Sequence, residues 1–471
     1  MKTLVMKFGG TSVGSVEALN YMAAIVQEQA SQWDGLVVVV SAMSGVTDLL
    51  VRAARTAADG DEHTYRDIIT ELSARHRQTI DALITADDEK AKLQTVVYEY
   101  LEELSAFCNS IHVLAEVTPR GMDAITSLGE RINARVVAAF LWQQGLKSQA
   151  VDATDLIVTD ENFQNAMPLM DLTCERVSEN LAPLLEDGIV PVVTGFVSAS
   201  EKGVITTLGR GGSDYTASIL GVCLCAAEVW TWTDVDGVMT ADPRAVPEAR
   251  VVPELSFAEI SELAYFGAKV LHPKTIRPII EEDIPLWVKN TFNASYPGTR
   301  ICAHPEAVSG RITAITAIKN LSMVTVEGRG MLGVPGIAAR TFAAVARVGA
   351  SVLMISQSSS EQSICFLIPT DTAPAVIASL ESEMALELAR RDIDRIWAHD
   401  DVVIVTVIGS GLRDTPGVGA RVFGALGEAN INVIAIAQGS SEFCISLVVK
   451  SEEGEEAVRH IHKRVIEEAS V

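Results

Sequence analysis

The C-terminal part of the chain contains two copies of one sequence pattern, and this repeat limits the possible folds more than any other feature. Val405-Thr406-Val407 lies 81 positions after Val324-Thr325-Val326, and the same offset separates Gln438 from Gln357 without a gap. Each copy predicts a strand, a helix opened by a Pro-Gly pair, two strands and a second helix. The repeat therefore indicates a small, ββ-paired α+β module that is present twice.

Before about residue 310 the chain alternates short β-rich runs with long helical patterns. Several of these runs are apolar at consecutive positions, as expected of strands covered on both faces. The candidate strands are Leu4–Phe8, Leu36–Ser41, Ile189–Thr194, Val229–Thr233 and Pro285–Lys289. We predict an α/β fold with a three-layer αβα sandwich over 1–305, including a mostly helical insertion at about 61–111. The two modules are predicted at 312–398 and 399–471. In an alternative arrangement, the C-terminal segment of the chain completes the first module.

Charge and composition exclude several classes of protein. The 471 residues include 37 Lys+Arg and 61 Asp+Glu, for a net charge of −24, so we expect neither a nucleic-acid nor a membrane partner. The apolar run Leu36–Val40 is far shorter than the roughly 20 residues of a membrane helix, and the N-terminus predicts no signal peptide. The scattered cysteines show no metal-site spacing, and Cys223 and Cys225 are predicted as packing. We expect a reduced, soluble, cytoplasmic protein.

The first candidate site is Lys7-Phe8-Gly9-Gly10-Thr11-Ser12, which follows a predicted strand and precedes a predicted helix. Gly9 and Gly10 allow backbone amides to approach a ligand, a helix N-terminus favours phosphate, and Lys7 adds a cation. The string is neither a Walker loop nor a dinucleotide fingerprint. Taken alone, a purely structural turn remains the alternative.

Together with further motifs, this string resembles the opening of the aspartate kinases. The motifs that match that family in order are Val40-Ser41-Ala42-Met43-Ser44-Gly45-Val46-Thr47, Ser127-Leu128-Gly129-Glu130-Arg131, Gly209-Arg210-Gly211-Gly212-Ser213-Asp214, Trp232-Thr233-Asp234-Val235-Asp236-Gly237 with Ala241-Asp242-Pro243-Arg244, and Phe266-Gly267-Ala268-Lys269-Val270-Leu271-His272-Pro273. The resemblance covers essentially the whole chain. It implies a catalytic domain of the amino-acid kinase type followed by two ACT domains, which the repeat fits.

The implied reaction transfers the γ-phosphoryl group of ATP to the side-chain carboxylate of L-aspartate. The product is 4-phospho-L-aspartate, and the reaction opens the biosynthetic pathway of the aspartate-derived amino acids. The acceptor is already ionised, since its pKa is about 3.9, so no general base is needed and catalysis depends on positioning and charge neutralisation. Mg2+ is expected as a cofactor that accompanies ATP, without protein ligands of its own.

The resemblance also implies a role for individual residues. Lys7 is expected to face the transferred phosphoryl group, Asp214 to orient the cationic groups, and Lys269 to serve the nucleotide side, as the catalytic set. The implied ATP-binding residues are Lys7, Gly9, Gly10, Ser41, Thr233, Asp234, Met239, Arg244, Lys269 and Val270. Met239 stands where related sequences often carry Tyr, so the resemblance does not extend to an aromatic contact there. Without the family, Asp214 would be interpreted as a turn or helix cap and Lys269 as a surface lysine.

For the acceptor, the resemblance implies a separate group of residues: Thr47, Glu130, Arg210, Gly211, Gly212 and Ser213. The planar guanidinium of Arg210 suits a bidentate pair with the α-carboxylate of aspartate. Glu130 is expected to pair with the substrate ammonium, and its alternative is an acid in the first turn of a helix.

The repeated modules are expected to bind an amino-acid effector that inhibits the kinase. The implied contacts are Gly336, Ile337 and Gln357 in the first module and Gly417, Val418 and Gln438 in the second. A helix start offers free amides to a carboxylate; the alternative is a simple helix start with Pro at the first position. The strings around both glutamines resemble threonine-responsive enzymes, while Glu361 and Glu442 keep lysine open as the effector. Homodimers or homotetramers through these modules are expected.

Two other hypotheses compete with this one. A different acid kinase of the same fold would use another acceptor. A non-catalytic amino-acid sensor predicts losses at Lys7, Asp214 or Lys269, and all three are present. Chain length further predicts that no homoserine dehydrogenase is fused to the second module.

Overall fold

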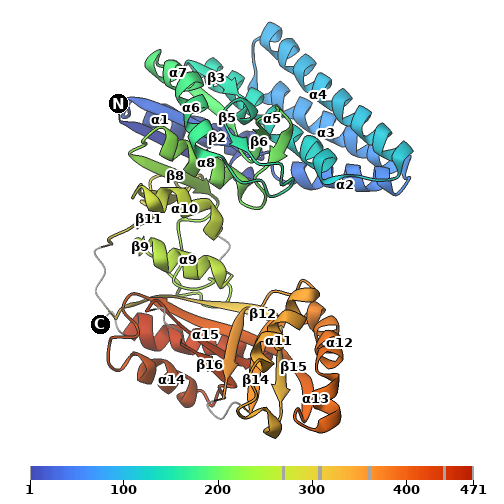
Figure 1. Cartoon of the computed structure of the whole chain (residues 1–471). Coiled ribbons are helices and arrows are strands. Elements are labelled where there is room, and N and C mark those ends of the chain that lie inside the picture. The colour runs from blue at the N-terminus through green and yellow to red at the C-terminus, as the bar shows by residue number, and fades with distance from the viewer. Residues whose placement is uncertain (1, 268–270, 306–309, 359–361, 439–441, 469–471) are drawn as a thin grey trace. The chain divides into compact units, whose positions relative to one another are not determined.

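A computed structural model describes residues 2–267, 271–305, 310–358, 362–438 and 442–468 (Figure 1). The chain forms two compact units. The first unit comprises Met1–Val238, Pro253–Phe257 and Val270–Pro305, and the second comprises Met239–Val252, Ala258–Lys269 and Glu306–Val471.

The first unit is built on an eight-stranded sheet. Its strands are, in order across the sheet, β3 (Ser148–Val151), β5 (Val190–Thr194), β2 (Gly35–Val40), β1 (Thr3–Phe8), β8 (Glu228–Thr233), β10 (Leu286–Asn290), β11 (Thr299–Cys302) and β9 (Glu254–Ser256). Only β10 and β11 pair antiparallel among these neighbours. The five predicted strands are confirmed to within one residue at each end.

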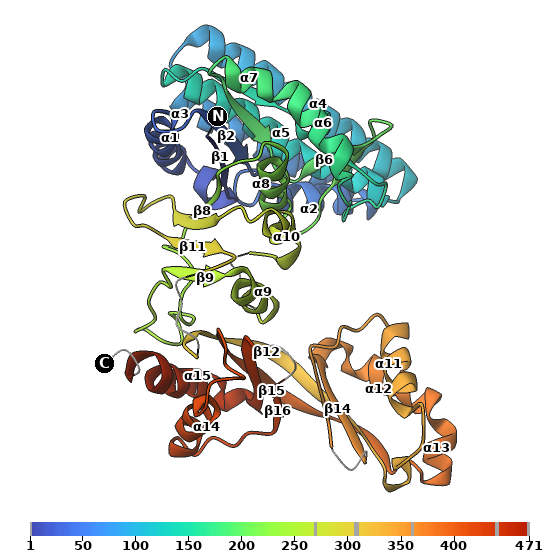
Figure 2. The same ribbon diagram turned by 60° about the vertical axis from the view of Figure 1, so that its left-hand side comes forward.

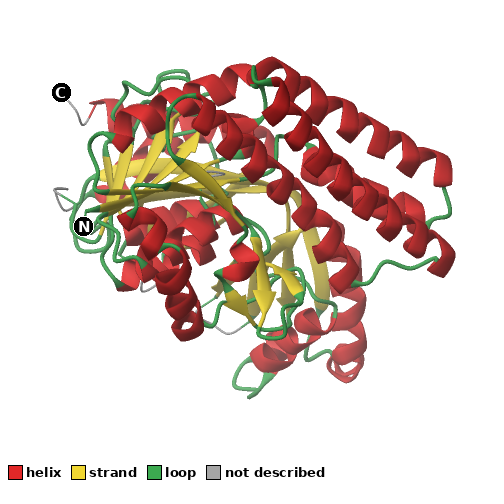
Figure 3. Cartoon of the chain, turned by 90° about the horizontal axis from the view of Figure 1, so that it is seen from above, coloured by secondary structure: helices red, strands yellow, loops and turns green. Residues whose placement is uncertain are grey.

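Helices cover both faces of this sheet and make the predicted three layers (Figure 3). On one face α1 and α5 pack against β2, and α5 also reaches β3 and β5; on the other, α8 packs against β1, β2 and β8 beside α6 and α10. The helices are α1 (Val16–Ala30), α2 (Val46–Ala58), α3 (Glu62–Leu83), α4 (Asp87–Leu114), α5 (Pro119–Gln143), α6 (Met170–Asn180), α7 (Ala182–Glu186), α8 (Gly212–Cys223) and α10 (Pro273–Glu281). The expected helical insertion corresponds to α3 and α4. No helix in the described ranges is both long and apolar enough to cross a membrane.

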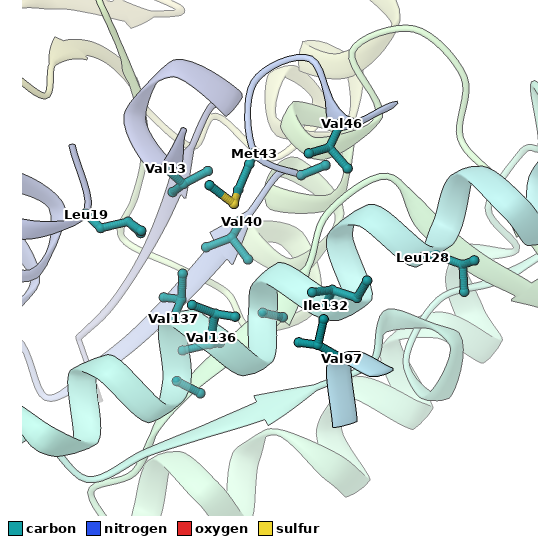
Figure 4. Close-up of a cluster of buried hydrophobic side chains, with 14 of the residues drawn as sticks. Val13, Leu19, Val40, Met43, Val46, Val97, Leu128, Ile132, Val136 and Val137 are labelled. Carbon is teal, nitrogen blue, oxygen red and sulfur yellow. The ribbon is translucent and has the colours of Figure 1, made fainter. Parts of the chain in front are cut away.

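A buried apolar cluster fixes α5 and the segment after β2 (Figure 4). Ile132 and Val136 of α5 and Val40 and Met43 of the β2 segment are at most 2% exposed. Burying each such side chain contributes about 1.5–3 kcal/mol. The cluster thereby holds rigidly two segments that carry predicted site residues, Ser41 and Glu130.

A small second sheet and several short helices complete the first unit. The sheet contains β4 (Val158–Thr159), β6 (Val197–Ser200) and β7 (Ile205–Thr207), and the short helices are η1 (Gly10–Val13) and η2 (Ala153–Asp155). Cys174 of α6 and Cys223 of α8 form a disulfide, with a Cα–Cα distance of 4.6 Å. We expected reduced cysteines and a plain packing role for Cys223. Both expectations are wrong for this pair. They failed because the contact between α6 and α8 joins residues 49 positions apart.

The second unit contains a six-stranded antiparallel sheet, whose strands can be followed in Figure 2. Across it the strands are β13 (Met354–Gln357), β14 (Ser363–Pro369), β12 (Ile312–Glu327), β15 (Arg395–Gly409), β17 (Cys444–Lys450) and β16 (Ala435–Ala437). Its helices are α9 (Phe257–Tyr265), η3 (Arg329–Met331), α11 (Ile337–Arg347), η4 (Thr370–Thr372), α12 (Ala373–Glu383), α13 (Ala385–Arg390), α14 (Val418–Glu428), η5 (Ser451–Glu453), α15 (Gly454–His462) and η6 (Lys463–Glu467). Each copy of the repeat has the predicted order of elements.

The boundary between the two modules differs from the expected one. Ile312 and Ile315, at the start of β12, belong to the hydrophobic core of the second module, whereas Val324 and Val326 belong to that of the first. Both cores also draw on β15, because β12 and β15 pair along their length, with register shifts after Ile312, Ile318 and Leu321. The segment shared between the modules is therefore the N-terminal end of β12, which packs in the core of the second module. The C-terminal segment also packs in that core and does not complete the first module.

Candidate active site

One cavity of about 400 Å³ brings together the residues predicted for the acceptor. It lies where β1 and β2 end and α8 begins, the usual ligand position in an open parallel sheet. The predicted residues that line it are Lys7, Gly10, Ser41, Thr47, Glu130, Arg210, Gly211, Gly212, Ser213 and Asp214. The structure therefore gathers four separate sequence motifs around one space.

Lys7 and Asp214 form a nearly buried ion pair in this cavity. Lys7 Nζ lies 2.8 Å from Asp214 Oδ1, and the two side chains are 11% and 16% exposed. Lys7 is placed by β1, where it pairs in register with Thr231 of β8. The Thr231 hydroxyl also donates to Asp214 Oδ1 at 3.4 Å. A cation held in this way has a defined position and little access to water.

The glycine turn after β1 differs from the predicted phosphate cradle in one respect. The Gly9 amide donates to the Trp232 carbonyl oxygen (3.1 Å), so the expectation that this amide faces a phosphate is wrong. It failed because Gly9 continues the hydrogen bonding between β1 and β8. Gly10 lines the cavity and is the first residue of the 3-10 helix η1, and α1 begins only at Val16.

Glu130 is a buried acid without a partner for one oxygen. It is 4% exposed, and no donor in the described part of the chain reaches its Oε2. Burial raises the pKa of Glu130 to about 8, although hydrogen bonds from the Ala42 and Glu130 amides oppose the shift. A buried carboxyl oxygen without a donor is costly, and a cationic ligand group would remove that cost.

Arg210 reaches the same cavity from a turn before α8. Gly209 and Gly211 on either side of it have φ of +79° and +74°, a conformation that favours glycine. The Gly212 amide donates to the Gly209 carbonyl oxygen at 2.9 Å, so the expectation that it is free for an anion is wrong; the turn itself uses it. Ser213 is held by Ser41, whose hydroxyl donates to Ser213 Oγ at 3.0 Å.

The predicted nucleotide residues are not all brought together. Thr233 ends β8 and Asp234 follows it. The Thr233 hydroxyl donates to Asp234 Oδ1 at 3.1 Å, but neither residue lines the cavity. Met239 and Arg244 belong to the second unit, and the Arg244 guanidinium pairs with Asp242 at 2.7 Å. Lys269 and Val270 lie outside the described residues.

In the repeated modules, the predicted effector residues occupy equivalent places. Gly336 and Gly417 cap α11 and α14 with φ of 92° and 86°. The simpler alternative required Pro at the first helical position. Pro335 and Pro416 do not occupy it, because each precedes the capping glycine. Ile337 and Val418 are buried, while Gln357 and Gln438 are exposed at the ends of β13 and β16.

Some cavity and support residues were missed by the sequence reasoning. Met43, Asp48 and Phe196 also line the cavity. Asn133 is fully buried and its amide donates to the Ser41 carbonyl oxygen at 2.7 Å. Asp48 follows a recognised motif directly, and Asn133 lies three positions after Glu130, so proximity to motifs was the available signal.

Comparisons with known proteins agree with this arrangement. Residues 2–290 match the amino acid kinase family, and residues 324–384 and 405–465 match ACT domains. Bifunctional aspartokinase/homoserine dehydrogenase 1 of Arabidopsis thaliana is 38% identical over 98% of this chain and 50% of its own length. Aspartokinase 1 of the same plant is 34% identical over 99% of this chain and 80% of its own. The chain thus spans about half the length of the bifunctional relatives it matches.

A solved structure resembles the chain over its whole length. E. coli aspartokinase III in complex with aspartate and ADP has a TM-score of 0.81 and 31% identity, covering 98% of this chain and 100% of that one. The same E. coli protein in complex with lysine and aspartate also has a TM-score of 0.81, with 30% identity and coverage of 99% and 100%. By domain composition, sequence identity and fold, the chain belongs to the aspartokinase branch of the amino acid kinase family.

Proposed function

We propose that the chain transfers the γ-phosphoryl group of ATP to the side-chain carboxylate of L-aspartate, giving 4-phospho-L-aspartate. The observation that carries this proposal is the presence in one cavity of a buried carboxyl with one unpartnered oxygen, that of Glu130, and an exposed guanidinium, that of Arg210. An α-amino acid offers the matching ammonium and carboxylate. The E. coli relative solved with aspartate and ADP supports the same substrate pair.

In this mechanism each residue has an electrostatic task. Glu130 and Arg210 bind the two α-substituents and leave the side-chain carboxylate of aspartate near Lys7. Lys7 neutralises charge on the transferred phosphoryl group, and Asp214 holds Lys7 in place. Because the acceptor is already an anion, alignment and charge stabilisation supply the catalysis.

Mg2+ would supply further neutralisation of the phosphate charge when bound with ATP. Within the described ranges, no three His, Cys, Asp or Glu side chains cluster as metal ligands. We propose that the ligands of this ion come mostly from phosphate oxygens and water, with Asp214, which pairs with Lys7, as a carboxylate beside it. Thr233 and Asp234 are proposed for the nucleotide on the strand-end side.

For regulation we propose an effector site in the first module, with threonine as the first candidate. The helix-opening loop there is open: Leu332 and Val334 are 61% and 46% exposed. In the second module, Gly310 packs closely against Thr415, and Arg421 donates to the Gly310 carbonyl oxygen. Lysine is the second candidate, because the E. coli relative was solved with it.

We also propose self-association through the modules. β13 and β16 are the two edges of the six-stranded sheet, and their Ile355 and Ile436 are 51% and 47% exposed. Exposed apolar edge strands tend to pair with another chain. Sedimentation velocity would show a dimer or tetramer, and a monomer at micromolar concentration would overturn this part. The predicted cytoplasmic location stays a prediction.

The test of the proposed activity is an ATP-dependent hydroxamate assay. L-Aspartate should give aspartyl hydroxamate, whereas succinate lacks the ammonium and β-alanine lacks the α-carboxylate, so both should react far more slowly. Threonine and lysine are added separately and together to identify the effector. Equal turnover of all three acceptors would favour another acid kinase, and no turnover of any would favour a sensor.

A further inference from the structure

Helix α5 carries a second buried acid besides Glu130. Asp123 is fully buried and lies seven residues before Glu130 in α5. Residues seven apart share one helix face, about 10 Å apart along the axis. Sequence motifs did not single out Asp123, and it does not line the cavity.

The carboxylate of Asp123 fastens two other segments to α5. The Thr207 hydroxyl and amide donate to it at 2.7 Å and 3.1 Å, and the Gln164 amide donates at 2.9 Å. Burial raises the pKa of Asp123, while these three bonds oppose the shift. A buried acid with this many donors is a strong anchor.

Both anchored segments lead directly to the turn that presents Arg210. Thr207 ends β7 and precedes Arg210 by three positions. Gln164 lies under the turn, because a Cβ on Gly209 would come within 2.9 Å of the Gln164 carbonyl oxygen. Lys274 links the same two segments by donating to Asn165 Oδ1 at 2.7 Å and to the Leu208 carbonyl oxygen at 3.3 Å.

Arg210 itself depends on this support. Its side chain is exposed, and no carboxylate in the described part of the chain pairs with it. The backbone of the turn therefore sets the point from which this side chain reaches the cavity. That backbone rests on Thr207 and Gln164, and these rest on Asp123.

We propose that Asp123 is a positioning residue that sets the location of Arg210 relative to Glu130. Helix α5 then carries Glu130, which binds the ammonium, as one of its own residues. Through Asp123 it also fixes the turn that presents Arg210, which binds the carboxylate. This device selects acceptors whose ammonium and carboxylate have the spacing of an α-amino acid. The inference rests on the proposed function, in which Arg210 and Glu130 bind those two groups.

A double-mutant cycle on kcat/KM for L-aspartate tests this role. Asp123→Asn should lower kcat/KM by about 10- to 100-fold, as expected for a misplaced binding group. In the Arg210→Ala background the same change should cost less than about twofold, because residues that act as a unit are not additive. The KM for ATP should not change. A loss of equal size in both backgrounds, or an equal rise in the KM for ATP, would overturn the inference.

Controls separate this result from general damage and from failure of the proposed function. Asp152→Asn removes another largely buried acid, one that pairs with Arg131 and Arg135, and should leave the KM for aspartate unchanged. Thr207→Val removes a single bond and should give a smaller effect of the same kind if Asp123→Asn does not fold. Turnover of L-aspartate by the unaltered protein is measured first; its absence would count against the proposed function, not against this anchor.

Discussion

Lys7 Nζ and Asp214 Oδ1 lie 2.8 Å apart and join the end of β1 to the first turn of α8. The pair is nearly buried, so each charge depends on the other for compensation. It also places a cation at the C-terminal edge of the sheet, beside the space that Glu130 and Arg210 line.

The first prediction concerns this pair. Asp214→Asn should lower kcat by about 10²- to 10³-fold, the usual cost of losing one transition-state contact, and Lys7→Met should cost at least as much. The double variant should be no worse than Lys7→Met alone. Lys2→Met is the control, since Lys2 lies over the Trp33 ring and should keep full activity. If the losses of kcat in the two single variants add up in the double variant, Lys7 and Asp214 do not act as one unit.

The second prediction concerns the pH dependence of aspartate binding. The pKa of Glu130 is about 8, so the free site is protonated at neutral pH and must lose a proton to bind an ammonium. The Kd for L-aspartate, measured calorimetrically without nucleotide, should therefore fall by up to about tenfold from pH 6 to pH 7 and level off above pH 8. Glu130→Gln should bind weakly and without this dependence. A flat profile in the unaltered protein would refute the assignment.

The third prediction concerns stability. Because folding raises the pKa of Glu130 from 4.5 to about 8, its contribution is intact at acid pH and is lost as pH rises from the unfolded value toward the folded one. Glu130→Gln should thus be more stable than the unaltered protein by roughly 1–3 kcal/mol at pH 7. The advantage should shrink near pH 5. Urea unfolding at both pH values measures it, and an identical difference at both would argue against a buried ionisable group.

The fourth prediction concerns the disulfide. Five cysteines are free and Cys174 and Cys223 are bonded, so the unreduced protein should show five reactive thiols after unfolding. Cys174→Ser should lower the free energy of unfolding by about 2–4 kcal/mol, since the bond closes a long loop. Cys225→Ser is the matched control and should have no such effect. Seven thiols in the unreduced protein would contradict the pairing.

The fifth prediction separates the two modules. If the effector binds in the first module only, Gln357→Ala should raise the threonine concentration for half-inhibition by about three- to tenfold, the value of one hydrogen bond. Gln438→Ala, its counterpart in the repeat, should leave inhibition unchanged. The reverse pattern would move the site to the second module. If only lysine inhibits, the same pair of variants is compared with lysine.

Much of the architecture followed from local patterns in the sequence. The five strands were predictable because continuous apolar runs leave few alternatives in an α/β chain, and the modules because the repeat is exact in length. The acceptor residues were predictable because they lie within recognised motifs. These motifs converge in space since parallel strands end at one edge of the sheet.

Other features depend on long-range contacts that no local pattern encodes. The Gly9 amide is used by Trp232, far away in sequence. Cys174 meets Cys223 only through the packing of α6 on α8. The crossover of β12 between modules reflects pairing with β15 along its whole length. Asp123 was missed for the same reason, because its partners Gln164 and Thr207 lie far from it in the sequence.

The most direct test of the central claim is phosphorus NMR of the reaction of the full chain with MgATP and L-aspartate. The account predicts an acyl-phosphate resonance that grows in step with ADP and that Arg210→Ala and Glu130→Gln both strongly reduce. It also predicts little acyl phosphate when β-alanine or succinate replaces aspartate. ADP formed without an acyl phosphate, or equal signals from all three acceptors, would contradict it.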